Sequence, residues 1–249
     1  MWETTLSANP TYFEEDLPFL DQLNIKIVLP AAGDTYNVTE RLAAFQGSQL
    51  DVLTLPPPEW QLLYASATEF NSQMTRQADQ GVALSMNVQK PPFDNIVVRR
   101  AILKAIDPWE YIKLIWVGRG TAGIGVPVPA PEWLFSQEEI GGSYLASPHK
   151  ARDLLNSTGL ELPIDIEMAV AEFDGIYLEL GRQIAKDLRA VEFNPTLRVW
   201  NPSHYTEALI EEPKEYQLAL GAFTAHLYGQ WIHAGATAQR RASHYCGAP

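Results

Sequence analysis

Four side chains able to bind a metal lie in the last 25 residues: His226, His233, His244 and Cys246. Imidazole and thiolate are ligands that Zn²⁺ prefers, but a closed zinc site requires characteristic short spacings between them. The intervals here fit no closed tetrahedral pattern. We therefore expect no metal site, and no other residue pattern calls for a cofactor.

A glycine pattern, Gly118-x-Gly120-x-x-Gly123, matches the dinucleotide-binding fingerprint on paper. That fingerprint works only after a strand and before a helix whose N-terminus meets the pyrophosphate. Here a helical pattern precedes the glycines, and prolines at positions 127, 129 and 131 stand where the second helix would have to run. The sequence thus argues against a nucleotide site.

Groups for acid, base or nucleophilic catalysis are not assembled in any recognisable motif. Glu14, Glu15 and Asp16 are consecutive carboxylates in a turn-rich segment, where a solvated turn is the expected role. The sequence contains no nucleophile elbow, phosphate loop or CxxC pair. We expect no catalytic residues and therefore a protein that is not an enzyme.

Charge and hydropathy restrict the partners further. The net charge is -12, and Lys and Arg are dispersed, which disfavours nucleic acid because phosphate binding needs concentrated positive charge. No apolar run approaches the roughly 18 residues of a membrane span. The start, MWETTLSANP, lacks the pattern of a signal peptide, and Cys246 has no second cysteine to pair with.

Alternating and helical patterns predict the elements of the first third of the chain. We expect strands over 2–6, 23–29, 50–55 and 82–86, and helices over 39–45 and 60–67. Three consecutive prolines from Pro56 end the third strand.

Helix-start signals are strongest in the middle of the chain. Asp94 or Asn95 can cap one helix, and Asp107 followed by Pro108 begins another, which Gly118 ends. The stretch 119–146 is rich in Gly and Pro, and we expect a long loop there.

From residue 147 onwards the pattern alternates between helix and strand. We expect helices over 147–159, 176–190 and 203–210, and strands over 164–170, 196–200 and 216–220. Strands alternating with helices predict an α/β fold with a largely parallel sheet.

Several segments, in order, resemble one family of ABC-importer proteins. The segments are NPTYFEEDLPFLDQLNIKIV (9–28), ERLAAFQGSQLDVL (40–53), VALSMNVQKPPFDNIVVRRAILKAIDPWEYIKLIWVGRGTAG (82–123) and GGSYLASPHKARDLLNSTGL (141–160). They are similar to the extracytoplasmic solute-binding proteins of family 5, which bind oligopeptides, dipeptides or nickel complexes. The third segment is the most specific, and the resemblance covers about residues 1–223.

The resemblance implies a two-lobed periplasmic-binding-protein-like fold, present only in part, with a hinge and a ligand between the lobes. Residues 1–84 would be the C-terminal part of the first lobe, and 85–91 the hinge crossing. Residues 92–249 would be the N-terminal part of the second lobe with an atypical tail. Members of the family are about twice as long by resemblance, so the chain looks like a fragment whose signal peptide is missing.

The resemblance also indicates the ligand-binding residues. The family has a Gly-Trp-x-x-Asp motif after the last predicted strand, where the ring packs on the ligand and the acid pairs with a peptide's ammonium. At the matching positions stand Phe223, which keeps an aromatic surface, and His226, which replaces the acid. An earlier aromatic position of the lobe falls on His204. For all three residues, an ordinary core or surface role is the competing interpretation.

The function implied is that of the substrate-binding component of an ABC importer. It would capture oligopeptides outside the cytoplasmic membrane and deliver them to the permease. The protein would be periplasmic, or tethered to the membrane by a lipid anchor that is missing from this fragment. One alternative is a binder of nickel complexes, sugars or another small solute. A second is a truncated, non-functional product.

Overall fold

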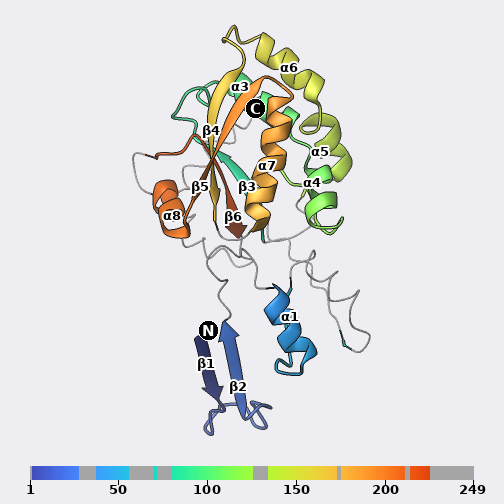
Figure 1. Ribbon diagram of the computed structural model, residues 1–249. Helices are drawn as coiled ribbons and strands as arrows, with labels where there is room; N and C mark the ends of the chain where they lie inside the picture. The colour runs from blue at the N-terminus through green and yellow to red at the C-terminus, as the bar shows by residue number, and fades with distance from the viewer. Residues whose placement is uncertain are drawn as a thin grey trace.

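The computed structural model describes residues 2–27, 38–55, 70–71, 80–125, 134–172, 175–210 and 214–224. Figure 1 shows a small N-terminal group of elements and a larger α/β body. We use "α/β body" for residues 80–224.

An antiparallel hairpin begins the chain. Strands β1 (Trp2–Ser7) and β2 (Gln22–Ile27) pair along their whole length, from Trp2 opposite Ile27 to Ser7 opposite Gln22. The strand alternation predicted from sequence is therefore confirmed. Helix α1 (Val38–Gln46) follows in the same N-terminal group, also as predicted.

The α/β body is built on a four-stranded sheet with the order β3-β6-β4-β5. The strands are β3 (Gln80–Met86), β4 (Ile164–Ala171), β5 (Phe193–Trp200) and β6 (Leu218–Thr224). Strand β4 is parallel to both β5 and β6, whereas β3 runs antiparallel to β6. The predicted, largely parallel sheet is thus confirmed, with β3 as an antiparallel strand at one edge.

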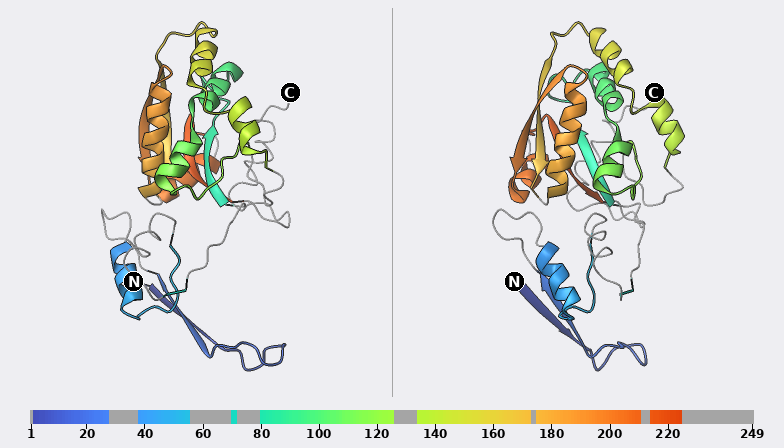
Figure 2. Two further views of the ribbon diagram at one scale, coloured as in Figure 1. Left: turned by 90° about the vertical axis from the view of Figure 1, so that its right-hand side faces the viewer. Right: turned by 45° about the vertical axis from the view of Figure 1, so that its right-hand side comes forward.

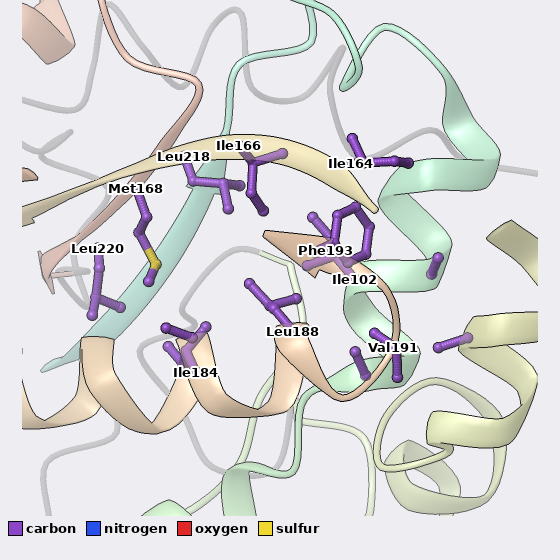
Figure 3. Packing of buried hydrophobic residues seen from close by; sticks show 14 of the residues in the cluster. Ile102, Ile164, Ile166, Met168, Ile184, Leu188, Val191, Phe193, Leu218 and Leu220 are labelled. Atoms are coloured by element: carbon purple, nitrogen blue, oxygen red, sulfur yellow. The ribbon is translucent and has the colours of Figure 1, made fainter. Parts of the chain in front are cut away.

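Helix α7 (Gly175–Arg189) packs on one face of this sheet, and α8 (Pro202–Ile210) on the other. Leu180, Ile184 and Leu188 recur at helical spacing on α7 and are buried. All three belong to the same core as the inward side chains of β4 and β6. Figure 3 shows Ile184 and Leu188 on the side of the sheet that carries Met168 and Leu220. The amphipathic pattern of α7 therefore accounts for much of the core.

Four further helices enclose the α7 side of the body (Figure 2). They are α3 (Ile96–Ala105), α4 (Pro108–Ile115), α5 (Gln137–Ser143) and α6 (Pro148–Asn156). The predicted caps are confirmed for two of them. The Asn95 side chain accepts from the backbone N–H of Val97, and Asp107 accepts from Trp109 and Glu110.

Two local expectations were wrong, and one predicted strand starts earlier than expected. Residues 50–55 form no strand, because no neighbouring strand pairs with them among the described residues. Helix α5 occupies part of the expected loop, and its signal was in the sequence, since Ser136 and Glu139 form a capping box. Strand β5 begins at Phe193 and includes Pro195, which an edge strand tolerates. The helix predicted over 60–67 lies outside the described residues.

The expected lobe boundary also differs from the observed pairing. Residues 80–84 were assigned to the first lobe, and 85–91 to the hinge crossing. In the structure all of β3 pairs with β6, from Gln80 opposite Thr224 to Met86 opposite Leu218. Strand β3 thus contains residues 80–84 and the first two residues of 85–91, and the boundary between the lobes stays a prediction.

Two adjacent glycines of α5 provide a test of packing. A Cβ atom on Gly141 would lie 3.2 Å from the ring of Trp109, whereas nothing lies within 4 Å of one on Gly142. Alanine is more favourable than glycine in a helix by about 1 kcal/mol. We expect Gly142→Ala to be neutral or stabilising, and Gly141→Ala to be at least about 1 kcal/mol less stable because Trp109 must move. Urea unfolding followed by Trp fluorescence measures both variants, and equal stabilities would contradict this packing.

Candidate ligand-binding edge

The carboxyl ends of three strands meet at one edge of the sheet. Ala171 of β4 lies opposite Trp200 of β5, and Val170 lies opposite Leu220 of β6. In open α/β sheets, ligands bind beyond the carboxyl ends of parallel strands. Figure 1 shows this edge turned toward the N-terminal elements, and we call it the carboxyl edge.

His204 lies at the carboxyl edge, in the first turn of α8. The helix starts there because the Asn201 side chain accepts a hydrogen bond of 3.0 Å from the His204 backbone N–H, as an N-cap does. The imidazole packs edge-on against the Trp200 ring, with centroids 4.6 Å apart. Its Nε2 lies 4.0 Å from Glu215 Oε2, and 44% of the side chain is exposed. The imidazole thus lies next to two side chains of the α/β body, Trp200 and Glu215, and the rest of its surface is exposed to solvent.

Helix α8 is held on the sheet by its next residue. Tyr205 is buried and packs with Ala169, Ala171 and Ala219 on the α8 face. Burial raises the pKa of the Tyr205 hydroxyl, and the neighbouring hydroxyls of Tyr216 and Tyr177 raise it further. Because the strand residues beneath α8 are alanines, the sheet surface leaves room for the Tyr205 ring. We call these small strand residues the floor beneath Tyr205.

The other two predicted ligand residues follow from β6. Phe223 lies in that strand, opposite Gly81 of β3, which places its backbone at the carboxyl edge. One strand, β4, separates β6 from β5 and the His204 turn. His226 lies outside the described residues. The structure thus brings His204 and the backbone of Phe223 to one edge, and their ligand-binding roles stay predictions.

Sequence reasoning missed two residues at this edge. Trp200 ends β5 and carries the ring that supports His204. Glu172 follows β4 and is exposed, and its backbone N–H donates to Trp200 O at 2.9 Å. Both could have been found from their position, since each stands at the end of a strand predicted to be parallel.

The described residues form two shallow cavities away from this edge. One, of about 480 Å³, lies at the start of β4 beside Leu162. The other, of about 210 Å³, lies between α4 and α7, where the Tyr111 hydroxyl donates to Asp187. Burial and this hydrogen bond raise the pKa of Tyr111, so the hydroxyl stays protonated and links the two helices.

Metal-ligating groups do not converge in the part of the chain that the structure describes, where no three His, Cys, Asp or Glu residues could share an ion. The cluster of His226, His233, His244 and Cys246 lies outside that part. Among the described helices, none is long and apolar enough to span a membrane.

A family model described as bacterial extracellular solute-binding proteins, family 5 middle, matches residues 3–230. The match includes both the N-terminal hairpin and the whole α/β body.

Two curated relatives are similar in sequence. Heme-binding protein A of Haemophilus influenzae is 31% identical over 153 residues, which cover 61% of this chain and 26% of the relative. Dipeptide-binding protein of Escherichia coli is 26% identical over 156 residues, covering 63% of this chain and 28% of the relative. The matched stretches thus span little more than a quarter of either relative.

A solved structure with the same fold is NikA from Brucella suis in complex with Fe(III)-EDTA. It superposes with a TM-score of 0.74 at 16% identity, over 95% of this chain and 49% of that chain. The expected two-lobed periplasmic-binding-protein-like fold, present only in part, is therefore confirmed.

Proposed function

Because the chain belongs to the bacterial extracellular solute-binding proteins of family 5, we propose that it is the substrate-binding component of an ABC importer. It captures oligopeptides outside the cytoplasmic membrane and delivers them to the permease. The match of the family model over residues 3–230 carries this proposal. No bond is made or broken in this role, since the free energy comes from ligand burial and lobe closure.

Peptide is the proposed ligand class because one of the relatives similar in sequence is a dipeptide-binding protein. The carboxyl edge of the α/β body supplies aromatic surface from Trp200, and the backbone of Phe223 lies at the same edge. Aromatic rings give a peptide apolar contact area, and the strand ends offer backbone groups for hydrogen bonds. His204 and His226 complete the proposed site.

The crossing between the lobes lies, in this proposal, before Gln80 rather than over 85–91. The full pairing of β3 with β6 supports this position, since a segment built into a sheet ladder cannot bend freely. The first lobe then contributes residues before β3, and the second begins with that strand.

A second candidate ligand class consists of metal complexes and other small solutes, such as nickel complexes, sugars or haem. It is favoured by His226 standing where the resemblance implies an acid, because imidazole suits a metal complex better than a peptide ammonium. A truncated product that binds nothing is the remaining alternative.

Titration of the 249-residue chain with di- and tripeptides, Ni(II)-histidine and haem tests these classes. A peptide at 100 times its Kd is expected to stabilise the fold by about 2.7 kcal/mol, which raises Tm by several degrees. His204→Ala should weaken binding about tenfold, as loss of one polar contact in a site does. His149→Ala is the matched control, because this exposed histidine pairs with Asp153 on α6. A response to Ni(II)-histidine or haem alone would favour the second class, and no response at all the truncated product.

A further inference from the structure

Strand β5 carries one arginine near the carboxyl edge, and its charge is already paired. Arg198 Nη2 and Nε donate to Glu167 Oε1 at 2.7 and 3.2 Å. Arg198 stands opposite Ala169 in the ladder, and Glu167 lies two residues nearer the start of β4. The guanidinium therefore reaches toward the amino end of β4, and it does not present a positive charge at the carboxyl edge.

Glu172, at the end of β4, is a carboxylate without such a partner. Its backbone N–H donates to Trp200 O at 2.9 Å, directly after the pair of Ala171 and Trp200, so its backbone is fixed at the carboxyl edge. The residue is exposed, and its carboxylate forms no ion pair or side-chain hydrogen bond in the part of the chain that the structure describes. A negative charge thus stands at this edge with nothing of the α/β body to neutralise it.

The neighbour of Glu172 across the ladder favours the same kind of ligand. Trp200 is only partly buried, and its ring packs with the His204 imidazole at the edge that we propose for the ligand. The face of an indole ring attracts ammonium and guanidinium groups, because its quadrupole is negative there. A carboxylate and an indole at adjacent strand ends therefore both favour a cation.

Ligand burial decides how much this charge contributes. An ion pair that stays in water gives little, so Glu172 alone would hardly retain a cation. A ligand that covers the carboxylate removes it from water, which is strongly unfavourable unless the ligand supplies a charged donor. The same residue thus stabilises a cationic ligand and disfavours a neutral or anionic one.

We propose that Glu172 makes the carboxyl edge selective for solutes that carry an ammonium or guanidinium group. The inference rests on the proposed function, because it names the charge of the ligand bound at that edge. In a peptide the group is either the α-ammonium or a Lys or Arg side chain. Peptides that lack one of these groups at a time distinguish the two sources.

Calorimetric titration of the 249-residue chain with Ala-Lys-Ala, Ala-Ala-Ala and their N-acetylated forms tests the selectivity. If the side chain is read, Ala-Lys-Ala should bind about tenfold more tightly than Ala-Ala-Ala, as a covered charge-assisted hydrogen bond provides. If the α-ammonium is read, N-acetylation of Ala-Ala-Ala should weaken binding by about the same factor. Glu172→Gln should reduce whichever contrast is found to less than about twofold.

Glu161→Gln is the matched control, because Glu161 is also exposed and precedes the opposite end of β4. This variant should retain the full contrast, and both variants should melt as the unmodified chain does, since each changes one exposed side chain. Equal binding of the cationic and uncharged peptides, or a contrast that survives Glu172→Gln, would overturn the selectivity and leave peptide capture standing. Absence of binding by all four peptides would overturn peptide capture itself, and the selectivity with it.

Discussion

Replacing Gly221 with alanine is expected to destabilise the α/β body by about 2–3 kcal/mol, the cost of overpacking a core without room to relax. A Cβ atom at this position of β6 would lie 2.2 Å from the Tyr205 hydroxyl oxygen and 2.6 Å from its Cζ. Tyr205 is buried, so its ring can yield only if α8 moves away from the sheet. Because His204 precedes it on α8, the displacement should also weaken binding at the carboxyl edge. Urea unfolding and peptide titration of the same variant measure the two effects.

Gly81 provides the matched control, since it also lies in a strand of this sheet and nothing lies within 4 Å of a Cβ atom built on it. Gly81→Ala should change stability by less than about 0.5 kcal/mol. In a Tyr205→Leu background the cost of Gly221→Ala should largely disappear, with a coupling energy of about 1–3 kcal/mol. Tyr205→Phe should not rescue, because the ring carbons remain. An equal cost of Gly221→Ala in both backgrounds would show that the close approach is not its cause.

Most helices and strands could be predicted from local patterns in the sequence. Alternation identified β1 and β2, helical spacing identified α7, and Asn95 and Asp107 marked helix starts that the hydrogen bonds confirm. These elements are specified by neighbouring residues, through capping and the burial of one face. Helix α5 was missed because the many Gly and Pro residues of 119–146 favoured a loop, and the Ser136 capping box was not recognised.

Features that depend on distant residues could not be predicted in this way. Strand β3 pairs with β6, which lies more than 130 residues later, and the pairing is antiparallel. The residues around β3 indicate neither the partner nor the direction. The expected lobe boundary falls inside β3 for this reason. The floor beneath Tyr205 is also non-local, since Gly221 and Ala169 belong to different strands. Side-chain position at the carboxyl edge is set by such contacts, so the sequence indicated His204 but not its neighbour Trp200.

The segment after β3 is tied to the segment before β6 by a set of hydrogen bonds centred on Asn87. This buried amide donates from Nδ2 to Tyr216 O at 2.9 Å, and its Oδ1 accepts from the Gln89 backbone N–H at 3.1 Å. Its own backbone N–H donates to Gln217 O at 2.8 Å. Next to it, Lys90 Nζ donates to Glu215 O. These bonds hold the end of β3 in the α/β body, in keeping with the proposal that movement between the lobes takes place before Gln80.

Asn87→Ala is accordingly expected to lower stability by about 1–3 kcal/mol, because Tyr216 O and the Gln89 N–H would lose their partner in a partly buried place. Exchange should rise first at the amides of residues 87–90 and 214–217, since these segments hold each other. Gln89→Ala is the control: its side chain is exposed, and the change should stay within about 0.5 kcal/mol. If this tether also fixes the second lobe for closure, Asn87→Ala should weaken peptide binding while Gln89→Ala does not. Unchanged exchange in 214–217 would mean that Asn87 does not hold the two segments together, and the crossing would then extend past β3.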